Sequence, residues 1–178
     1  MIKTILVATD GSPHARKAVA FAAESAAAFK ARLVIAHVLL RDADGATLRK
    51  LANRSALSKE QRRLLDNYEV DAQLAMAASG VETVIPGSVP PPPEVLELVG
   101  QAVVERAAEA AKKAGAKRVT TALVSGDPAE AILARAKREK ANLIVLGTRG
   151  RDELKSLLLG SVSHKVAAEA RCPVTTVK

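Results

Sequence analysis

Residues 142–163, NLIVLGTRGRDELKSLLLGSVS, combine a predicted buried strand with two glycine turns in one contiguous segment. Its apolar run LIVL ends at Gly147, which is typical of a strand buried on both faces of a parallel sheet. Gly147 and Gly150 frame a turn where residues without a Cβ can take positive φ and admit a ligand close to the backbone. Gly160 and Ser161 open a second apolar periodic stretch, which predicts a helix with Ser161 at its N-terminus. Backbone N–H groups of both turns would converge on an anion such as phosphate.

On both sides of this stretch the chain alternates predicted strands with predicted helices. Strands are expected at 2–9, 33–40, 118–124, 143–146 and 173–177, and helices at about 13–29, 94–115, 128–140 and 161–171. Ser12-Pro13 and Asp127-Pro128 each place a capping residue before a proline, and Glu130 stands in the position of a capping box. This alternation predicts an α/β fold with an open, doubly wound parallel sheet, whose ligands bind beyond the carboxyl ends of the strands.

The middle of the chain is less regular. At 178 residues the protein fits a single domain, with an insertion or a long irregular connection at about 41–94. Leucines among charged residues at 47–68 predict one or two amphipathic helical pieces. The four prolines that end residues 80–93 predict an extended, polyproline-like spacer. A surface insertion without chemistry and a partner-binding element both remain open.

Composition narrows the possible functions. The net charge is +8, but basic residues are interspersed with acids and only two Phe and one Tyr are present, which favours solvated helices over nucleic-acid binding. No apolar run has the length of a membrane span, and the first one is too short for a signal peptide. The lone Cys172 agrees with a reducing compartment. We therefore expect a cytoplasmic protein with no membrane or nucleic-acid partner.

The full pattern Gly147-x2-Gly150-x9-Gly160-Ser161 resembles the ATP-binding signature of the universal stress protein family. The resemblance extends to KTILVATDGSPHARKAV near the N-terminus, to SGDPAEAILARAKREKANLIVLGTRG, and to the final GSVSHKVAAEARCPVTTVK. It covers roughly residues 1–40 and 95–178 and leaves the middle unmatched.

The resemblance implies a Rossmann-like sheet of the adenine nucleotide alpha hydrolase type, with strand order 3-2-1-4-5 and helices on both faces. In that order the first and fourth strands lie side by side, and a nucleotide site lies at their carboxyl ends. The site residues that it implies are Ala8, Thr9, Asp10, Val38, Gly126, Gly147, Arg149, Gly150, Gly160, Ser161, Val162 and Ser163. The hydroxyl groups of Ser161 and Ser163 could donate to phosphate while also capping the helix.

Several of these residues have a second interpretation. By resemblance Asp10 lies near the ribose and phosphates, although an aspartate there also suits an Asx turn or a cap. Val38 would contact the adenine edge through its backbone N–H and C=O, and its side chain would otherwise be ordinary core. Gly126 would border the pocket or simply form a turn. Arg149 could reach phosphate oxygens or remain a cation facing solvent.

No catalytic constellation emerges from the sequence, because it has no Gly-x4-Gly-Lys loop, no zinc-ligand spacing and no justified Ser-His-Asp arrangement. We therefore expect an ATP-binding regulatory module of the stress response, with Mg²⁺ accompanying the nucleotide and with slow hydrolysis left open. The resemblance also implies a homodimer that pairs through the C-terminal strand at 173–177. The alternative is an interaction protein of the same fold that binds AMP, another small ligand or no nucleotide, and whose insertion contacts an unknown protein partner.

Overall fold

A computed structural model of the chain describes residues 1–39, 45–52, 57–78, 90–148 and 160–178. Their elements, in chain order, are β1 (Thr4–Ala8), α1 (Pro13–Ala28), β2 (Arg32–Val38), α2 (Gly45–Ala52), α3 (Lys59–Ala78), α4 (Pro93–Lys113), β3 (Arg118–Val124), α5 (Pro128–Arg138), β4 (Leu143–Gly147), α6 (Ser161–Glu169) and β5 (Val174–Val177). The chain divides into two compact units, of which one holds residues 1–38 and 103–178 and the other residues 39–102. Most of the predicted polyproline spacer at 80–93 lies outside the described residues.

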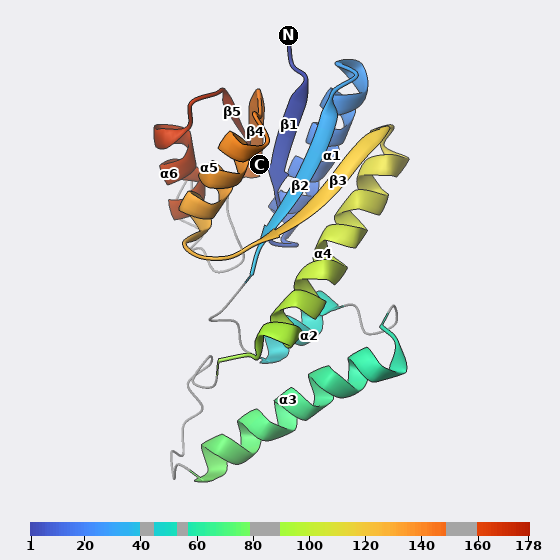
Figure 1. The fold of residues 1–178 in the computed structure, drawn as a ribbon, viewed down its shortest axis with the longest axis vertical. Coiled ribbons are helices and arrows are strands. Elements are labelled where there is room, and N and C mark those ends of the chain that lie inside the picture. The colour runs from blue at the N-terminus through green and yellow to red at the C-terminus, as the bar shows by residue number, and fades with distance from the viewer. Residues whose placement is uncertain (40–44, 53–56, 79–89, 149–159) are drawn as a thin grey trace. The chain divides into compact units, whose positions relative to one another are not determined.

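The first unit is built on a parallel sheet of five strands in the order β3-β2-β1-β4-β5. The α/β fold and the strand order expected from the resemblance are thereby confirmed. Val7 of β1 pairs with Ile35 of β2 on one side and with Val145 of β4 on the other, so β1 is the central strand (Figure 1). The carboxyl ends of β1 and β4 therefore meet at the same edge of the sheet.

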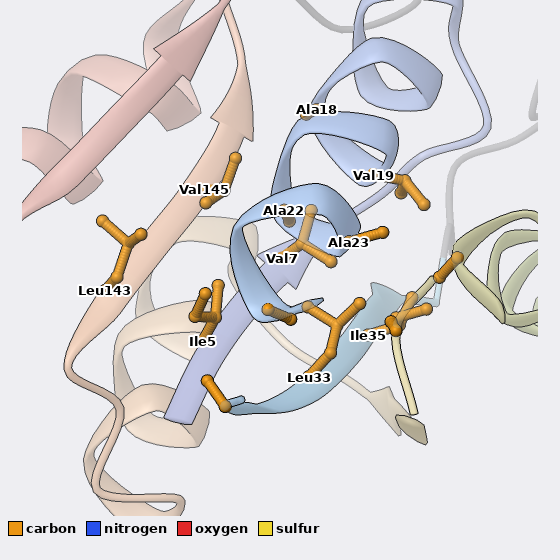
Figure 2. Close-up of a cluster of buried hydrophobic side chains, with 14 of the residues drawn as sticks. Ile5, Val7, Ala18, Val19, Ala22, Ala23, Leu33, Ile35, Leu143 and Val145 are labelled. Carbon is orange, nitrogen blue, oxygen red and sulfur yellow. The ribbon is translucent and has the colours of Figure 1, made fainter. Parts of the chain in front are cut away.

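Successive strand residues point to opposite sides of the sheet, and apolar residues lie on both sides. Helices pack against both faces and bury these residues. On one face, Ile5 and Val7 of β1 are fully buried and lie against Ala22 of α1 (Figure 2). The small alanine side chains of α1 let the helix lie close to the sheet, as its small-residue pattern predicts. On the other face, Leu6 and its neighbours pack with α5 and α6, where Ile132 is buried. Burial of each large aliphatic side chain contributes about 1.5–3 kcal/mol.

The sequence signals for the starts of two helices are confirmed. The Ser12 Oγ accepts a hydrogen bond of 3.2 Å from the Ala15 amide at the start of α1. The Asp127 Oδ1 accepts one of 3.1 Å from the Glu130 amide at the start of α5.

The predicted start of the last helix at Ser161 is confirmed, but the expected capping by Ser161 is wrong, because the N-cap residue is Gly160. Gly160 keeps an extended backbone, with φ −74° and ψ 160°, and no side chain caps the helix. Ser161 is consequently the first helical residue.

The second unit confirms the amphipathic helices predicted between residues 47 and 68, since α2 and α3 lie there and α3 continues to Ala78. A capping box starts α3: the Gln61 amide donates to the Ser58 Oγ at 3.1 Å, and the Ser58 amide donates to the Gln61 Oε1 at 2.9 Å. Leu48 and Leu65 are fully buried in this unit. None of the helices in the described ranges is both long and apolar enough to cross a membrane.

Candidate functional site: the carboxyl edge of β1 and β4

The turn that follows β1 is held by its own side chains. The Thr9 amide continues the sheet by donating to the Ala36 carbonyl at 2.9 Å, and the Thr9 Oγ1 then accepts the Gly11 amide at 3.2 Å. The Asp10 Oδ1 accepts the Ser12 amide at 2.9 Å, so Asp10 forms an Asx turn. Its other oxygen, Oδ2, forms no hydrogen bond with the described residues. Asp10 is half-buried at the edge and retains one carboxylate oxygen for a ligand.

Gly147, the last residue of β4, packs closely against the start of α1. A Cβ at this position would lie 3.0 Å from the His14 carbonyl carbon and 3.0 Å from the Ala15 amide nitrogen, and both are backbone atoms. Any side chain would therefore push β4 away from α1. Because the turn that contains Asp10 leads directly into α1, this close approach brings the β1 turn and the β4 loop together.

The two glycine turns predicted from the sequence meet at Thr148 and Gly160. The Gly160 amide donates to the Thr148 carbonyl at 2.7 Å, across a segment whose residues 149–159 lie outside the described ranges. The Ser163 Oγ lies 3.1 Å from the Thr148 carbonyl oxygen and 2.9 Å from that of Gly160, so its hydroxyl donates within this closure. Ser163 is 4% exposed, which places its hydroxyl group inside the protein.

The first turn of α6 supplies backbone donors at this edge. Amides in the first turn of a helix have no acceptor within the helix, and together with the helix dipole they favour an anion. Ser161 is exposed and Val162 is half-buried, so this turn is accessible from solvent.

Thr148 is a site residue that the sequence reasoning missed. Its Oγ1 is buried and forms no hydrogen bond with the described residues. A buried hydroxyl without a partner is unusual in a folded protein. The sequence signal that could have assigned Thr148 to the site is its position directly after Gly147, inside the glycine loop.

The neighbouring strand end carries the residues expected to meet an adenine ring. Val38 is the last residue of β2 and is 9% exposed, and Ala8 ends β1 with the same exposed fraction. His37 is buried, and its Nδ1 donates to the Thr9 carbonyl at 2.8 Å, which ties β2 to the Asp10 turn.

Gly126 lies in the turn before α5 with φ +110°, a conformation that favours glycine, and a Cβ there would meet open space. The next residue, Asp127, accepts from Lys165 of α6 at 3.3 Å, and Glu130 accepts from the same ammonium group at 3.1 Å. The Glu130 amide first, and then Lys165, hold the pKa of Asp127 below its ordinary value. Hydrogen bonds to Glu130 and then Asp127 raise the pKa of Lys165. These contacts join the starts of α5 and α6 at the carboxyl edge.

Two predicted site residues, Arg149 and Gly150, lie outside the described residues. Within the described ranges, no group of three or more His, Cys, Asp or Glu side chains could hold a metal ion. The described residues of this edge offer backbone donors, the buried Thr148 hydroxyl group and the Asp10 carboxylate.

Comparison with known proteins identifies the family. The profile of the Universal stress protein family matches residues 1–178. A universal stress protein of Thermus aquaticus, encoded in the QAH/OAS sulfhydrylase 3′ region, is 36% identical over 178 residues that span 100% of both chains. Universal stress protein Rv1636 of Mycobacterium tuberculosis is 30% identical over 175 residues, which are 98% of this chain and 95% of that protein. The crystal structure of a universal stress protein in complex with cAMP aligns with a TM-score of 0.60 and 25% identity, over 99% of this chain and 96% of that one. The chain belongs to the universal stress protein family.

Proposed function

We propose that this protein binds an adenine nucleotide, ATP with Mg²⁺, at the carboxyl edge of β1 and β4, and acts as a regulatory module of the stress response without catalysing a reaction. The observation that carries the proposal is the hydrogen bond from Gly160 to Thr148, which closes the β4 loop onto the first turn of α6. An anion above this closure would meet helix amides on one side and the glycine loop on the other.

The residues at this edge suit a nucleotide in three respects. Gly147 leaves no side chain between the loop and α1, and the buried Thr148 Oγ1 lacks a partner among the described residues. The end of β2 presents the main chain of Val38, which could recognise an adenine edge in a protein with few aromatic residues. The related universal stress protein that was crystallised with cAMP supports an adenine nucleotide as the ligand class.

The decisive variant is Ser161→Asp, because it should change protein stability and nucleotide affinity in opposite directions. A carboxylate in the first turn of a helix stabilises the helix by about 0.3–1 kcal/mol. The same charge would repel the phosphates of a nucleotide bound at that turn. We expect a free energy of unfolding equal to or above that of the wild type, with ATP affinity in calorimetric titration reduced about tenfold or more, which equals about 1.4 kcal/mol.

Ser161→Asn is the matched control, since asparagine has nearly the same shape as aspartate but carries no charge. It should retain an ATP affinity close to that of the wild type. If Ser161→Asp binds ATP as tightly as Ser161→Asn does, the phosphates do not lie at α6 and the proposed site is wrong. A titration panel of ATP, ADP, AMP and cAMP, with mass spectrometry of ligand released from the purified protein, identifies the preferred nucleotide. Binding of none of them would favour an interaction protein of the same fold.

We further propose that Asp10 contributes to magnesium binding through Oδ2, either directly or through water. Asp10→Asn preserves an amide oxygen for the Ser12 N–H and so keeps the turn. With EDTA present, the variant should bind ATP at least as tightly as the wild type, because a negative charge near the phosphates has been removed. With Mg²⁺ added, the wild type should gain affinity and Asp10→Asn should gain less. An equal gain in both proteins would exclude Asp10 from the metal site.

The proposal includes a cytoplasmic homodimer that pairs through β5. It predicts no sustained hydrolysis at typical enzyme rates of about 1 s⁻¹ or more. An ATPase assay at that sensitivity, under saturating Mg²⁺, would reveal a catalyst.

A further inference from the structure

A cavity of about 270 Å³ lies at the opposite, amino edge of the sheet. Its wall is formed by the last turns of α5, the start of β4, the end of α6 and the residues just before β5. Ile144 of β4 belongs to this cavity, whereas Gly147 belongs to the carboxyl edge, and the three residue steps between them along the strand span roughly 10 Å. The cavity is therefore separate from the proposed nucleotide site.

The floor of the cavity is apolar. Ala136 of α5 and Ile144 of β4 are buried beneath it, and Leu133 and Cys172 are partly exposed at its sides. A small apolar group placed there would cover surface that water now contacts, which is favourable in proportion to the area covered.

The rim of the cavity is cationic. Lys137, Lys140 and Arg171 line it with a single acid, Glu169, and all four residues are exposed. None of the four side chains forms an ion pair with another described residue. The nearby Glu139 does not line the cavity, and its carboxylate is paired with Arg32 and Arg135, which do not line it either.

Part of this positive charge balances the negative ends of two helix dipoles. Both α5 and α6 end at the cavity, and each helix C-terminus carries about half a negative charge, which favours basic side chains nearby. Glu169 and the two helix ends together supply about two negative charges, and the three basic side chains supply three positive charges. The rim therefore keeps about one positive charge in excess. The excess suits a ligand with a single negative charge.

We propose that this cavity binds a small amphipathic carboxylic acid, with its apolar tail on the floor and its carboxylate between Lys140 and Arg171. The guanidinium group can hold a carboxylate with two parallel hydrogen bonds. The cavity is slightly smaller than the usual range of about 300–1,000 Å³ for ligand pockets, so the acid is a short one.

Cys172 provides the test, because it is the only cysteine of the chain and lines the cavity. Its thiol is partly exposed, and burial raises the pKa of that thiol, so a neutral aromatic disulfide, 2,2′-dithiodipyridine, should modify it slowly at mildly alkaline pH. Octanoate should slow this modification in a saturable way, by about tenfold when its concentration is about ten times its dissociation constant, because only the free fraction reacts. Octanol lacks the charge, acetate lacks the tail, and neither should protect at the same concentration.

The variants Lys140→Gln and Arg171→Gln remove exposed rim charges without touching the floor. Each should lose most of the protection by octanoate while keeping the wild-type modification rate without ligand. Lys112→Gln, an exposed lysine on α4 that does not line the cavity, is the control and should keep full protection. An increase in melting temperature with octanoate provides a second readout that does not depend on the thiol.

Three outcomes would overturn the proposal. They are no protection and no thermal shift with octanoate, equal protection by octanol, and unchanged protection in both rim variants. ATP should leave the Cys172 rate unchanged, and protection by ATP but not by octanoate would assign the cavity to the nucleotide instead. Failure of the nucleotide site would not affect this test, because the two edges are probed by different ligands.

Discussion

The hydroxyl group of Ser163 can donate one hydrogen bond at a time, although the carbonyl oxygens of both Thr148 and Gly160 lie within reach. A hydroxyl that donates to these carbonyls has no proton left for a phosphate. The sequence suggested that Ser161 and Ser163 could both donate to phosphate, and the structure gives the two serines different environments. Ser161 is exposed at the start of α6, whereas Ser163 is buried and its hydroxyl group lies within hydrogen-bond distance of the Thr148 and Gly160 carbonyls.

This difference predicts the effect of two alanine variants. Ser163→Ala should lower the free energy of unfolding of the ligand-free protein by about 1 kcal/mol, because a buried hydrogen bond is lost. Ser161→Ala should lower it by less than Ser163→Ala does, because Ser161 is exposed whereas Ser163 is buried. Urea denaturation of both proteins without nucleotide measures this. A Ser163→Ala protein of wild-type stability that nevertheless binds ATP weakly would show that the hydroxyl contacts the ligand directly.

Some features of the helices and strands follow from local sequence signals, whereas others depend on tertiary contacts. The starts of α1 and α5 could be predicted because a capping side chain followed by proline specifies a helix start without help from the rest of the chain. Parallel strands could be recognised as short apolar runs for a similarly local reason. The strand order followed from the resemblance to a family, since it depends on contacts between distant segments.

The details of the site could not be predicted from local signals. The bond between Gly160 and Thr148 fixes where α6 begins, and Gly160 therefore takes the N-cap position that a serine usually prefers. The Thr148 hydroxyl, which has no partner among the described residues, is buried by tertiary packing, and its place after a glycine does not by itself indicate burial. Single-residue roles at the site depend on tertiary contacts that only the folded chain reveals.

Helix α5 is tied to β2 by an ion pair whose contribution depends on pH. The Glu139 carboxylate lies 2.7 Å from Arg32 of β2 and 2.7 Å from Arg135 one turn earlier in α5. The hydrogen bond from Arg32, followed by the charge of Arg135, lowers the pKa of Glu139 from its ordinary value of 4.5. A lowered pKa in the folded state means that folding favours the ionised form. The stabilisation is therefore complete above about pH 4.5 and is lost as the pH falls through the lowered value.

Glu139→Gln should remove this part of the pH dependence. Between neutral pH and about pH 3, the free energy of unfolding of the wild type should fall more steeply than that of Glu139→Gln, because only the wild type takes up a proton at this site on unfolding. Glu24→Gln changes an exposed acid on α1 and should follow the wild-type curve. Parallel curves for wild type and Glu139→Gln would show that the ion pair with Arg32 contributes nothing to stability.

The sheet has two edge strands, β3 and β5. An edge strand presents unpaired N–H and C=O groups, which a second copy of the same strand can satisfy in a two-fold interface. The pairing of β5 with β4 shows which of its residues remain available. The Pro173 carbonyl accepts from Ile144 and the Val177 carbonyl accepts from Thr148, so the odd-numbered residues direct their backbone groups toward β4. The alternation of a parallel ladder then directs the backbone groups of Val174 and Thr176 to the free edge.

This geometry makes Thr176→Pro the variant that tests the proposed homodimer. Proline removes the N–H that points away from β4 and is tolerated at an edge, so the monomer should remain folded while pairing between β5 strands is lost. Thr175→Pro is the matched contrast, because it removes an N–H that points toward β4 and should destabilise the monomer itself. Light scattering at micromolar concentration should show a dimer for the wild type and a monomer for Thr176→Pro, with circular dichroism confirming the fold. A wild-type monomer, or a Thr176→Pro protein that still forms dimers, would exclude β5 as the interface and would direct attention to β3.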